Sequence, residues 1–104
     1  MLLASCSTML PGRMYVYPGK QMMQFSIEKS SGHGKMTALD QQTGENFTGD
    51  YSAYYVGKNA RGEGTLVGDK GRSIKMRFTI KPGSRPTGRG TGIDQEGRRY
   101  EVFF

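Results

Sequence analysis

The chain has 104 residues, a formal net charge of +6 and one cysteine, which fits a single domain and excludes an internal disulfide or a cysteine-based metal cluster. Its sixteen glycines, about twice the average usage of roughly 7 %, are scattered singly among alternating apolar residues, which favours short strands joined by turns over a low-complexity tract. No window repeats apolar residues at helical spacing over three turns, so we expect almost no helix.

The first twenty residues are interpreted as a signal remnant and tether. This segment includes a short strand at residues 14–17, because Pro11-Gly12 and Pro18-Gly19 are turn signals on either side of it. A single β domain is then expected over residues 21–104, where apolar and polar residues alternate in successive short runs.

The clearest strand pattern follows the turn Asp69-Lys70-Gly71. Apolar residues occupy every second position from Ile74 to Ile80, which is typical of a half-buried strand. Gly71 supplies the positive φ that a short hairpin loop needs. The strands of the domain are predicted at residues 21–29, 35–40, 45–56, 62–68, 73–80, 88–94 and 98–104.

These elements predict an all-β fold, an antiparallel meander of hairpins with six to eight strands that forms a small barrel or a sandwich. Three segments beginning at Gly32, Gly62 and Gly88 share the order Gly-x-Gly, short strand, acidic residue, turn glycine and apolar residue. Their regular spacing indicates stacked or consecutive hairpins. The predicted core comprises Phe25, Ile27, Tyr51, Leu66, Ile74, Met76, Phe78, Ile80, Tyr100 and Val102.

The positive charge is uneven, since residues 58–99 contain eleven Lys or Arg and four Asp or Glu. Such a basic half-domain suggests an anionic partner, among them lipid headgroups, lipopolysaccharide, a cell-wall polymer or nucleic acid. If the last hairpins pair, cations of neighbouring strands form a patch that binds phosphate groups. The alternative is a solvated face whose cations only prevent edge-to-edge aggregation. The candidate anion-binding residues are Arg72, Lys75, Arg77, Lys81, Arg98 and Arg99.

Familiar catalytic arrangements are not found in the sequence. His33 is the only histidine and lies in a glycine loop, so no Ser-His-Asp or Cys-His set can be assembled without it. The Gly-x-Gly pieces need a helix behind them to bind phosphate, and none is predicted. No metal set reaches three ligands at familiar spacing. We therefore expect a protein that is not an enzyme and that uses no cofactor and no metal.

Leu3-Ala4-Ser5-Cys6 resembles the lipobox of bacterial lipoproteins, in which the cysteine thiol receives a diacylglyceryl group and the chain is cut just before it. The resemblance implies lipidation of Cys6. Ser7, in place of the Asp associated with inner-membrane retention, implies the periplasmic face of the outer membrane. A signal peptide needs about 7–15 apolar residues, and only five residues precede Cys6. A longer natural leader, a signal remnant and a chance match therefore stay open.

Together with the lipobox, residues 60–104 resemble small uncharacterised proteobacterial lipoproteins. The shared features are Gly-Thr-Leu-x-Gly-Asp-Lys-Gly-Arg and a Gly-x-Gly hairpin that closes on Tyr-x-Val-x-Phe, and they imply no particular activity. Residues 47–71 also resemble degenerate MORN-type repeats, β-hairpin units associated with membrane or protein contact. They share aromatic-x-Gly-x-aromatic and Gly-x-Gly pieces with these repeats, although Trp is absent and the spacing of the third copy slips.

These observations predict a non-enzymatic envelope lipoprotein that is tethered through Cys6 and whose β domain binds or scaffolds an envelope component, an anionic molecule or a protein. The alternative is a small basic β-barrel that binds single-stranded nucleic acid through cations interleaved with aromatics such as Tyr51, Tyr54 and Tyr55. Lipidation of Cys6 discriminates between the two, because an exported lipoprotein does not ordinarily meet nucleic acid.

Overall fold

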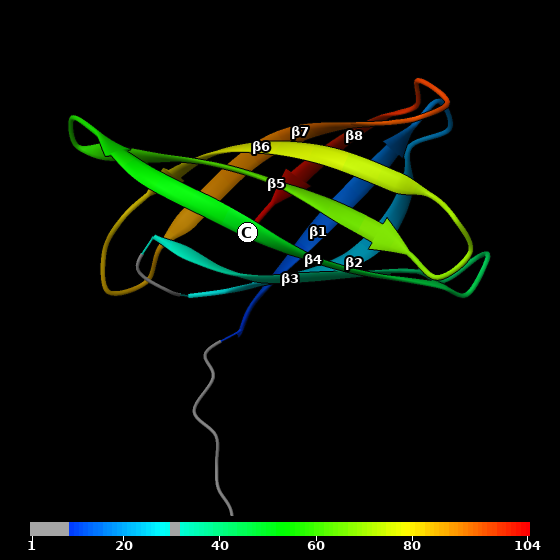
Figure 1. Cartoon of the computed structure of the whole chain (residues 1–104), viewed down its shortest axis with the longest axis horizontal. Coiled ribbons are helices and arrows are strands. Elements are labelled where there is room, and N and C mark those ends of the chain that lie inside the picture. Colours follow the sequence, from blue (N-terminus) through cyan, green and yellow to red (C-terminus); the bar gives the residue numbers. More distant parts are fainter. Residues whose placement is uncertain (1–8, 30–31) are drawn as a thin grey trace, which may run out of the picture.

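The computed structural model describes residues 9–29 and 32–104, and in this part of the chain eight antiparallel strands form a closed barrel (Figure 1). Each strand pairs with the next along the chain, and β1 pairs with β8 to close the barrel. The predicted all-β meander of hairpins is thus confirmed, as a barrel and not a sandwich. The strands are β1 Met9–Tyr17, β2 Gln21–Glu28, β3 His33–Asp40, β4 Glu45–Val56, β5 Asn59–Gly68, β6 Ser73–Lys81, β7 Thr87–Asp94 and β8 Arg99–Phe103.

β1 is a full strand of the barrel wall, which corrects the expected domain boundary at residue 20. It pairs with β2 from Met9 and with β8 from Arg13. Pro11, interpreted as a turn signal, lies where only β2 is a neighbour, the kind of one-sided position to which prolines in sheets are confined. A Cβ at Gly12 would lie 2.3 Å from the carbonyl oxygen of Phe103, so glycine is needed here for close packing and not for a turn.

The core fills the barrel interior, because alternate residues of each strand point inward. Nine of the ten predicted core residues are buried, and Ile80 is half-buried against them. The prediction missed Met14, Met23 and Met36, whose flexible side chains suit irregular interior spaces. The core cluster consists of Met14, Val16, Met23, Phe25, Ile27, Met36, Ala38, Phe47, Tyr51, Leu66, Ile74, Met76, Phe78, Tyr100 and Val102.

The alternating strand directions give the barrel two different ends. The connections that follow β1, β3, β5 and β7 lie at one end, which we call the cluster end. The connections that follow β2, β4 and β6 lie at the other, the tip end, where β1 also begins. The three Gly-x-Gly segments form the consecutive hairpins β3–β4, β5–β6 and β7–β8, so their acidic residues Asp40, Asp69 and Asp94 all come to the cluster end.

The β4–β5 hairpin reaches farthest at the tip end, where it is the green loop at the upper left of Figure 1. The pairing of β3 with β4 stops at Ser52, whereas β4 pairs with β5 as far as Val56 and Asn59. Gly57, at φ 64°, occupies the left-handed conformation that such a two-residue turn requires. The last residues of β4 therefore have a strand neighbour on one side only.

Candidate functional site

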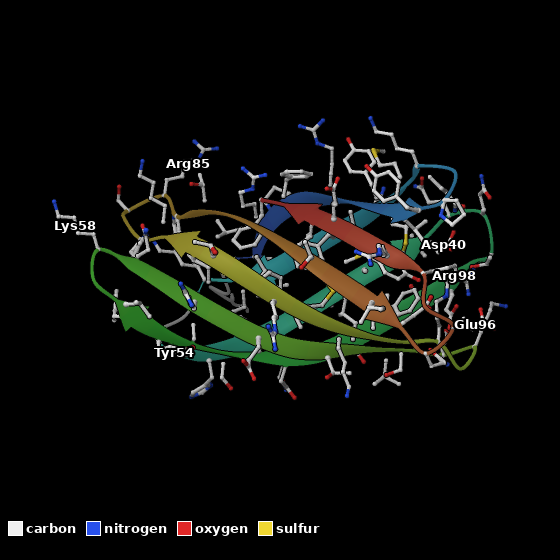
Figure 2. All side chains as sticks on the ribbon, turned by 90° about the horizontal axis from the view of Figure 1, so that it is seen from above. Asp40, Tyr54, Lys58, Arg85, Glu96 and Arg98 are labelled. Atoms are coloured by element: carbon white, nitrogen blue, oxygen red, sulfur yellow. The ribbon has the colours of Figure 1, made fainter. Side chains whose placement is uncertain are left out.

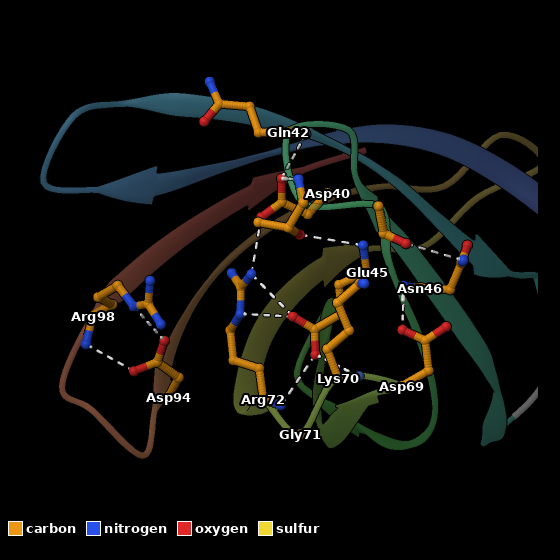
Figure 3. Close-up of polar contacts among 12 residues, drawn as sticks. Asp40, Gln42, Glu45, Asn46, Asp69, Lys70, Gly71, Arg72, Asp94 and Arg98 are labelled. Carbon is orange, nitrogen blue, oxygen red and sulfur yellow. Dashed lines mark hydrogen bonds and ion pairs between the residues drawn. The ribbon is translucent and has the colours of Figure 1, made fainter.

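Arg72, one of the candidate anion-binding residues, lies at the centre of a buried ionic cluster (Figure 3). Its side chain is 10 % exposed, and the side chains of Asp40 and Glu45 are 3 % and 4 % exposed. The Arg72 Nη2 atom lies 2.9 Å from Asp40 Oδ2 and 3.1 Å from Glu45 Oε1. Arg72 is thus already bound by two carboxylates of its own chain and is directed away from an external anion.

The cluster connects all four turns of the cluster end. Arg72 Nη1 donates to the Tyr100 hydroxyl at 3.2 Å, and that hydroxyl donates to Asp94 Oδ2 at 2.8 Å. Gln21 Nε2 donates to Asp40 Oδ1 at 2.7 Å, which joins the first connection to the others. Among residues 9–29 and 32–104, no buried side-chain nitrogen or oxygen lacks a hydrogen-bond partner. A satisfied polar network of this kind rigidifies one end of the barrel.

The cluster keeps its protonation state across neutral pH. Burial acts to raise the pKa of Asp40, but hydrogen bonds from Arg72 and from two backbone N–H groups outweigh burial and hold that pKa below its ordinary value. The pKa of Asp94 is lowered in the same way, against burial, by the Tyr100 hydroxyl and the Arg98 N–H. Burial, together with Asp94, raises the pKa of Tyr100 to about 12, although the hydrogen bond from Arg72 opposes the increase.

Arg98, a second candidate, also has partners within the cluster end. Its Nε atom lies 3.0 Å from Asp94 Oδ2, and its Nη2 atom pairs with Glu96. The sequence places Arg72 and Arg98 in the basic half of the chain, but it does not show that the fold brings carboxylates to both.

Three other candidates, Lys75, Arg77 and Arg99, lie together on the outer surface of β6 and β8. In the register, Ile93 stands between Lys75 and Arg99 and faces both. In the described part of the chain, none of the three cations forms an ion pair with a carboxylate. They line a broad, shallow hollow of about 1030 Å³ in the outer wall.

Three further arginines join these cations on the outer wall, and closure of the barrel by β1 and β8 is what brings Arg13 among them. Arg61, Arg89 and Arg13 fall in one row across the outer wall, separated by Thr79 and Phe103. With strands spaced about 4.8 Å apart, the Cα atoms of Arg61 and Arg89 are roughly 10 Å apart. We call the exposed, outward-facing cations of the wall the basic face: Arg13, Arg61, Lys75, Arg77, Arg89 and Arg99.

A second hollow, of about 510 Å³, lies within the basic face. Its lining includes Arg61, Arg77 and Arg89, with Tyr54 and Phe103 beside them. The face also contains Glu63, opposite Arg77 in the register, and Glu101, which accepts a hydrogen bond from Tyr17 at 2.9 Å. Asp50 also lines the larger hollow, where it pairs with Lys35. Six cations and three carboxylates still leave the face positive, so it is able to attract an anion.

Sequence reasoning missed Arg13 and Arg61 for an identifiable reason. Arg13 lies in the segment interpreted as tether, and Arg61 in the segment interpreted as the loop before residue 62. The sequence does contain a pattern that could have identified Arg61 as a strand residue. Ala60, Gly62 and Gly64 alternate with polar residues, which extends the alternation of β5 back to its first residues.

The remaining predicted sites lie elsewhere. Lys81 ends β6 on the outward side of that strand, two residues beyond Thr79 toward the tip end, and Cys6 lies outside the described residues. Within residues 9–29 and 32–104, no three His, Cys, Asp or Glu side chains are grouped to hold a metal ion. The same part of the chain contains no helix of the length and hydropathy needed to cross a bilayer.

Comparison with known proteins finds no matching family, no matching curated protein and no matching solved structure.

Proposed function

We propose that the protein is a non-enzymatic lipoprotein of the bacterial envelope, anchored through Cys6 at the periplasmic face of the outer membrane, whose barrel binds an anionic envelope component. The observation that carries the binding role is the basic face, where six exposed cations gather without a carboxylate partner in the described chain. Cations of structural use, such as Arg72, have their carboxylates close by. Those of the basic face are left available for a ligand.

The anchor is supported by the position of the lipobox. Cys6 is three residues before Met9, where β1 begins, so the anchor and the barrel would be close neighbours. Each methylene group of a bound acyl chain that enters the bilayer contributes about 0.8 kcal/mol, and two or three chains hold a protein firmly.

Phosphate is the anion that best fits the basic face. Five of its six cations are arginines, whose planar guanidinium groups bind phosphate oxygens in pairs. Arg61 and Arg89 are separated by roughly two strand spacings, about 10 Å, which suits a ligand with more than one phosphate. Lipopolysaccharide carries phosphates of this kind and passes the periplasmic face on its way to the outer leaflet, so it is the ligand we propose.

The anchor is tested by the intact mass of the protein purified from its native host, with fragmentation of the N-terminal peptide. A chain that begins at Cys6 and carries acyl groups supports the proposal. An unmodified Met1 terminus in the soluble fraction contradicts it.

The binding role is tested with lipopolysaccharide and the double variant Arg77→Glu/Arg89→Glu. Loss of several charge-assisted contacts should weaken binding at least about tenfold at low salt. The matched control is Lys20→Glu/Lys70→Glu, which changes the net charge equally at the cluster end. Equal weakening by both variants would show a general charge effect and no site on the basic face.

One observation favours single-stranded nucleic acid as the second candidate. Tyr54 and Phe103 lie beside Arg61 and Arg89 in the same hollow, and aromatic rings next to cations are what successive bases stack on. This candidate predicts tight binding of an oligothymidylate that weakens steeply with salt, together with a chain that is not acylated. An acylated Cys6 removes it.

A further inference from the structure

The tip of the β4–β5 hairpin exposes three successive apolar or aromatic residues. Tyr54, Tyr55 and Val56 are 56 %, 76 % and 44 % exposed. Tyr55 shares the strand face of the buried Tyr51, but it lies beyond the last β3–β4 pair, and the described part of the chain leaves it mainly exposed. A run of three exposed apolar residues is unfavourable in water unless it serves a contact.

The tip continues into an apolar hollow of about 570 Å³ at the same end of the barrel. Its apolar lining includes Leu10, Ile80 and Phe104, together with Pro82 and Pro86 of the β6–β7 connection, and Glu28 and Lys29 also border it. Apolar surface therefore extends from the hairpin tip across the mouth of the barrel.

Cations surround this apolar surface. Lys58 is in the hairpin turn itself, Lys81 ends β6, Arg85 lies within the β6–β7 connection, and Lys29 follows β2. Figure 2 shows Tyr54, Lys58 and Arg85 together at one end of the molecule, with Asp40, Glu96 and Arg98 at the other. In the described β2–β3, β4–β5 and β6–β7 connections and the residues bounding them, Glu28 is the only carboxylate side chain.

The tip end is also the end from which the N-terminal segment departs. Met9, the first residue of β1, is there, and Cys6 is three residues earlier in the sequence. Three residues span at most about 11 Å, whatever conformation they adopt. A lipid attached to Cys6 would therefore hold the tip end, and not the cluster end, close to the bilayer.

We propose that the tip end of the barrel docks on the surface of an anionic phospholipid bilayer, with Tyr54, Tyr55 and Val56 in the headgroup region and Lys58, Lys81 and Arg85 against lipid phosphates. Tyrosine side chains favour this interface because their rings are apolar and their hydroxyls are polar. Basic residues near an anionic membrane surface add attraction. The inference deepens the proposed function and rests on it for the anchor.

The cations around the apolar surface favour an anionic bilayer over the other partners that could cover such a surface. A second copy of the chain docked tip to tip would bring the same cations together, which is repulsive. An anionic lipid surface offers complementary charge and an apolar layer at once, and both are needed to cover this end.

The test uses the full chain with Cys6→Ser, so that no acyl group contributes, and vesicles of phosphatidylethanolamine with a minority of phosphatidylglycerol. Co-sedimentation at about 0.1 M salt measures binding. Tyr54→Ser/Tyr55→Ser should weaken it about tenfold, because buried apolar area sets the binding strength of such surfaces. Lys58→Glu should weaken it up to about 30-fold, since each unit of charge near the lipid surface contributes about fivefold.

Two controls match these variants. Lys70→Glu makes the same charge change at the cluster end and should alter binding less than about twofold, because screening confines the attraction to about 10 Å at moderate salt. Met22→Ser/Val67→Ser removes two exposed apolar residues of the outer wall that line neither hollow of the basic face and should leave binding unchanged. Absence of wild-type binding, or equal losses in tip and control variants, overturns the docking.

The vesicle experiment and the mass measurement test the docking and the anchor independently of each other. If the mass of native protein shows no acyl group but the tip variants lose vesicle binding, the docking stands and the lipoprotein proposal fails. If Cys6 is acylated but the tip variants of the unacylated chain bind vesicles as well as wild type does, the anchor stands and the docking fails.

Discussion

The two ends of the barrel differ in how their charged and apolar side chains are arranged. The cluster end contains five of the nine Asp and Glu residues, and its hydrogen bonds join all four connections through Arg72, Asp40 and Tyr100. The tip end has one carboxylate side chain in its described connections and leaves Tyr54, Tyr55 and Val56 in contact with water. One end satisfies its polar groups internally, and the other leaves its cations and apolar groups exposed, which is the basis of the proposed docking.

In this small barrel, the residues that stabilise the fold and the residues proposed to contact a membrane lie at opposite ends. A 104-residue domain has a modest core, and fixing the turns at one end adds stability without using the surface of the other. The tip end then tolerates residues that contribute little to folding. The following predictions test that separation, beginning with the largest expected effect.

Replacing Arg72 with Met should destabilise the barrel most. Arg72→Met leaves the buried carboxylates of Asp40 and Glu45 without their cation, and breaking a buried ion pair in this way costs about 3–5 kcal/mol. Urea unfolding followed by circular dichroism measures the loss. The matched control at the tip end, Arg85→Met, should stay within about 0.5 kcal/mol of wild type. Similar losses in both variants would contradict the separation of roles.

Acid should weaken the cluster end selectively. Asp40 and Asp94 have pKa values below the ordinary 3.8, so the unfolded chain binds more protons there, and their contribution is complete above about pH 4 and lost as pH falls through the lower folded values. The loss should be smaller than for Arg72→Met, because a protonated carboxyl still forms hydrogen bonds. Asp94→Asn should flatten the acid limb of the stability profile, which urea unfolding at a series of pH values measures.

Tyr100→Phe should have an intermediate effect. The hydroxyl accepts from Arg72 and donates to Asp94, and leaving buried partners unsatisfied costs about 1–3 kcal/mol. The folded pKa of about 12 exceeds the ordinary 10.0, so wild-type stability is complete below pH 10 and declines between pH 10 and 12. The variant should lack this alkaline decline. An identical alkaline limb in both proteins would show that Tyr100 is not its cause.

The smallest expected effect on folding is at the tip. Tyr54→Ser/Tyr55→Ser should change the free energy of unfolding by no more than about 0.5 kcal/mol, since both side chains are mainly solvent-exposed. Urea unfolding of this variant also serves as the folding control for the vesicle experiment. A loss above about 1 kcal/mol would mean that the tip packs against the barrel and is not reserved for a partner.

The strand pattern was largely predictable, because alternation is a local property of the chain. The predicted strands at residues 45–56 and 88–94 nearly coincide with β4 and β7, and Ile74, Met76 and Phe78 are buried as expected. The wrong domain boundary at residue 20 also came from reading a local pattern. Pro11-Gly12 is typical of a turn, and only the pairing of β1 with β8 shows that these residues belong to the wall.

The candidate site was less predictable, because it depends on which strands are neighbours. Lys75 and Arg77 were correctly placed on the polar side of a strand, and the fold leaves both exposed. Arg72 is in the same basic stretch of sequence, yet the turn after β5 directs it onto Asp40 and Glu45, more than twenty residues away. Nothing local distinguishes a cation that closes a barrel end from one that faces water.

The sequence by itself determined the all-β fold, the hairpin order and most of the core, because period-two alternation and turn glycines act over a few residues. Only the tertiary structure decided that eight strands close into a barrel, that Arg13 joins Arg61 and Arg89 in one row, and that Asp40, Glu45 and Asp94 gather around Arg72 at the end opposite Tyr54 and Tyr55. Register and closure are set by contacts between residues far apart in the chain, and those contacts give each charge its neighbours.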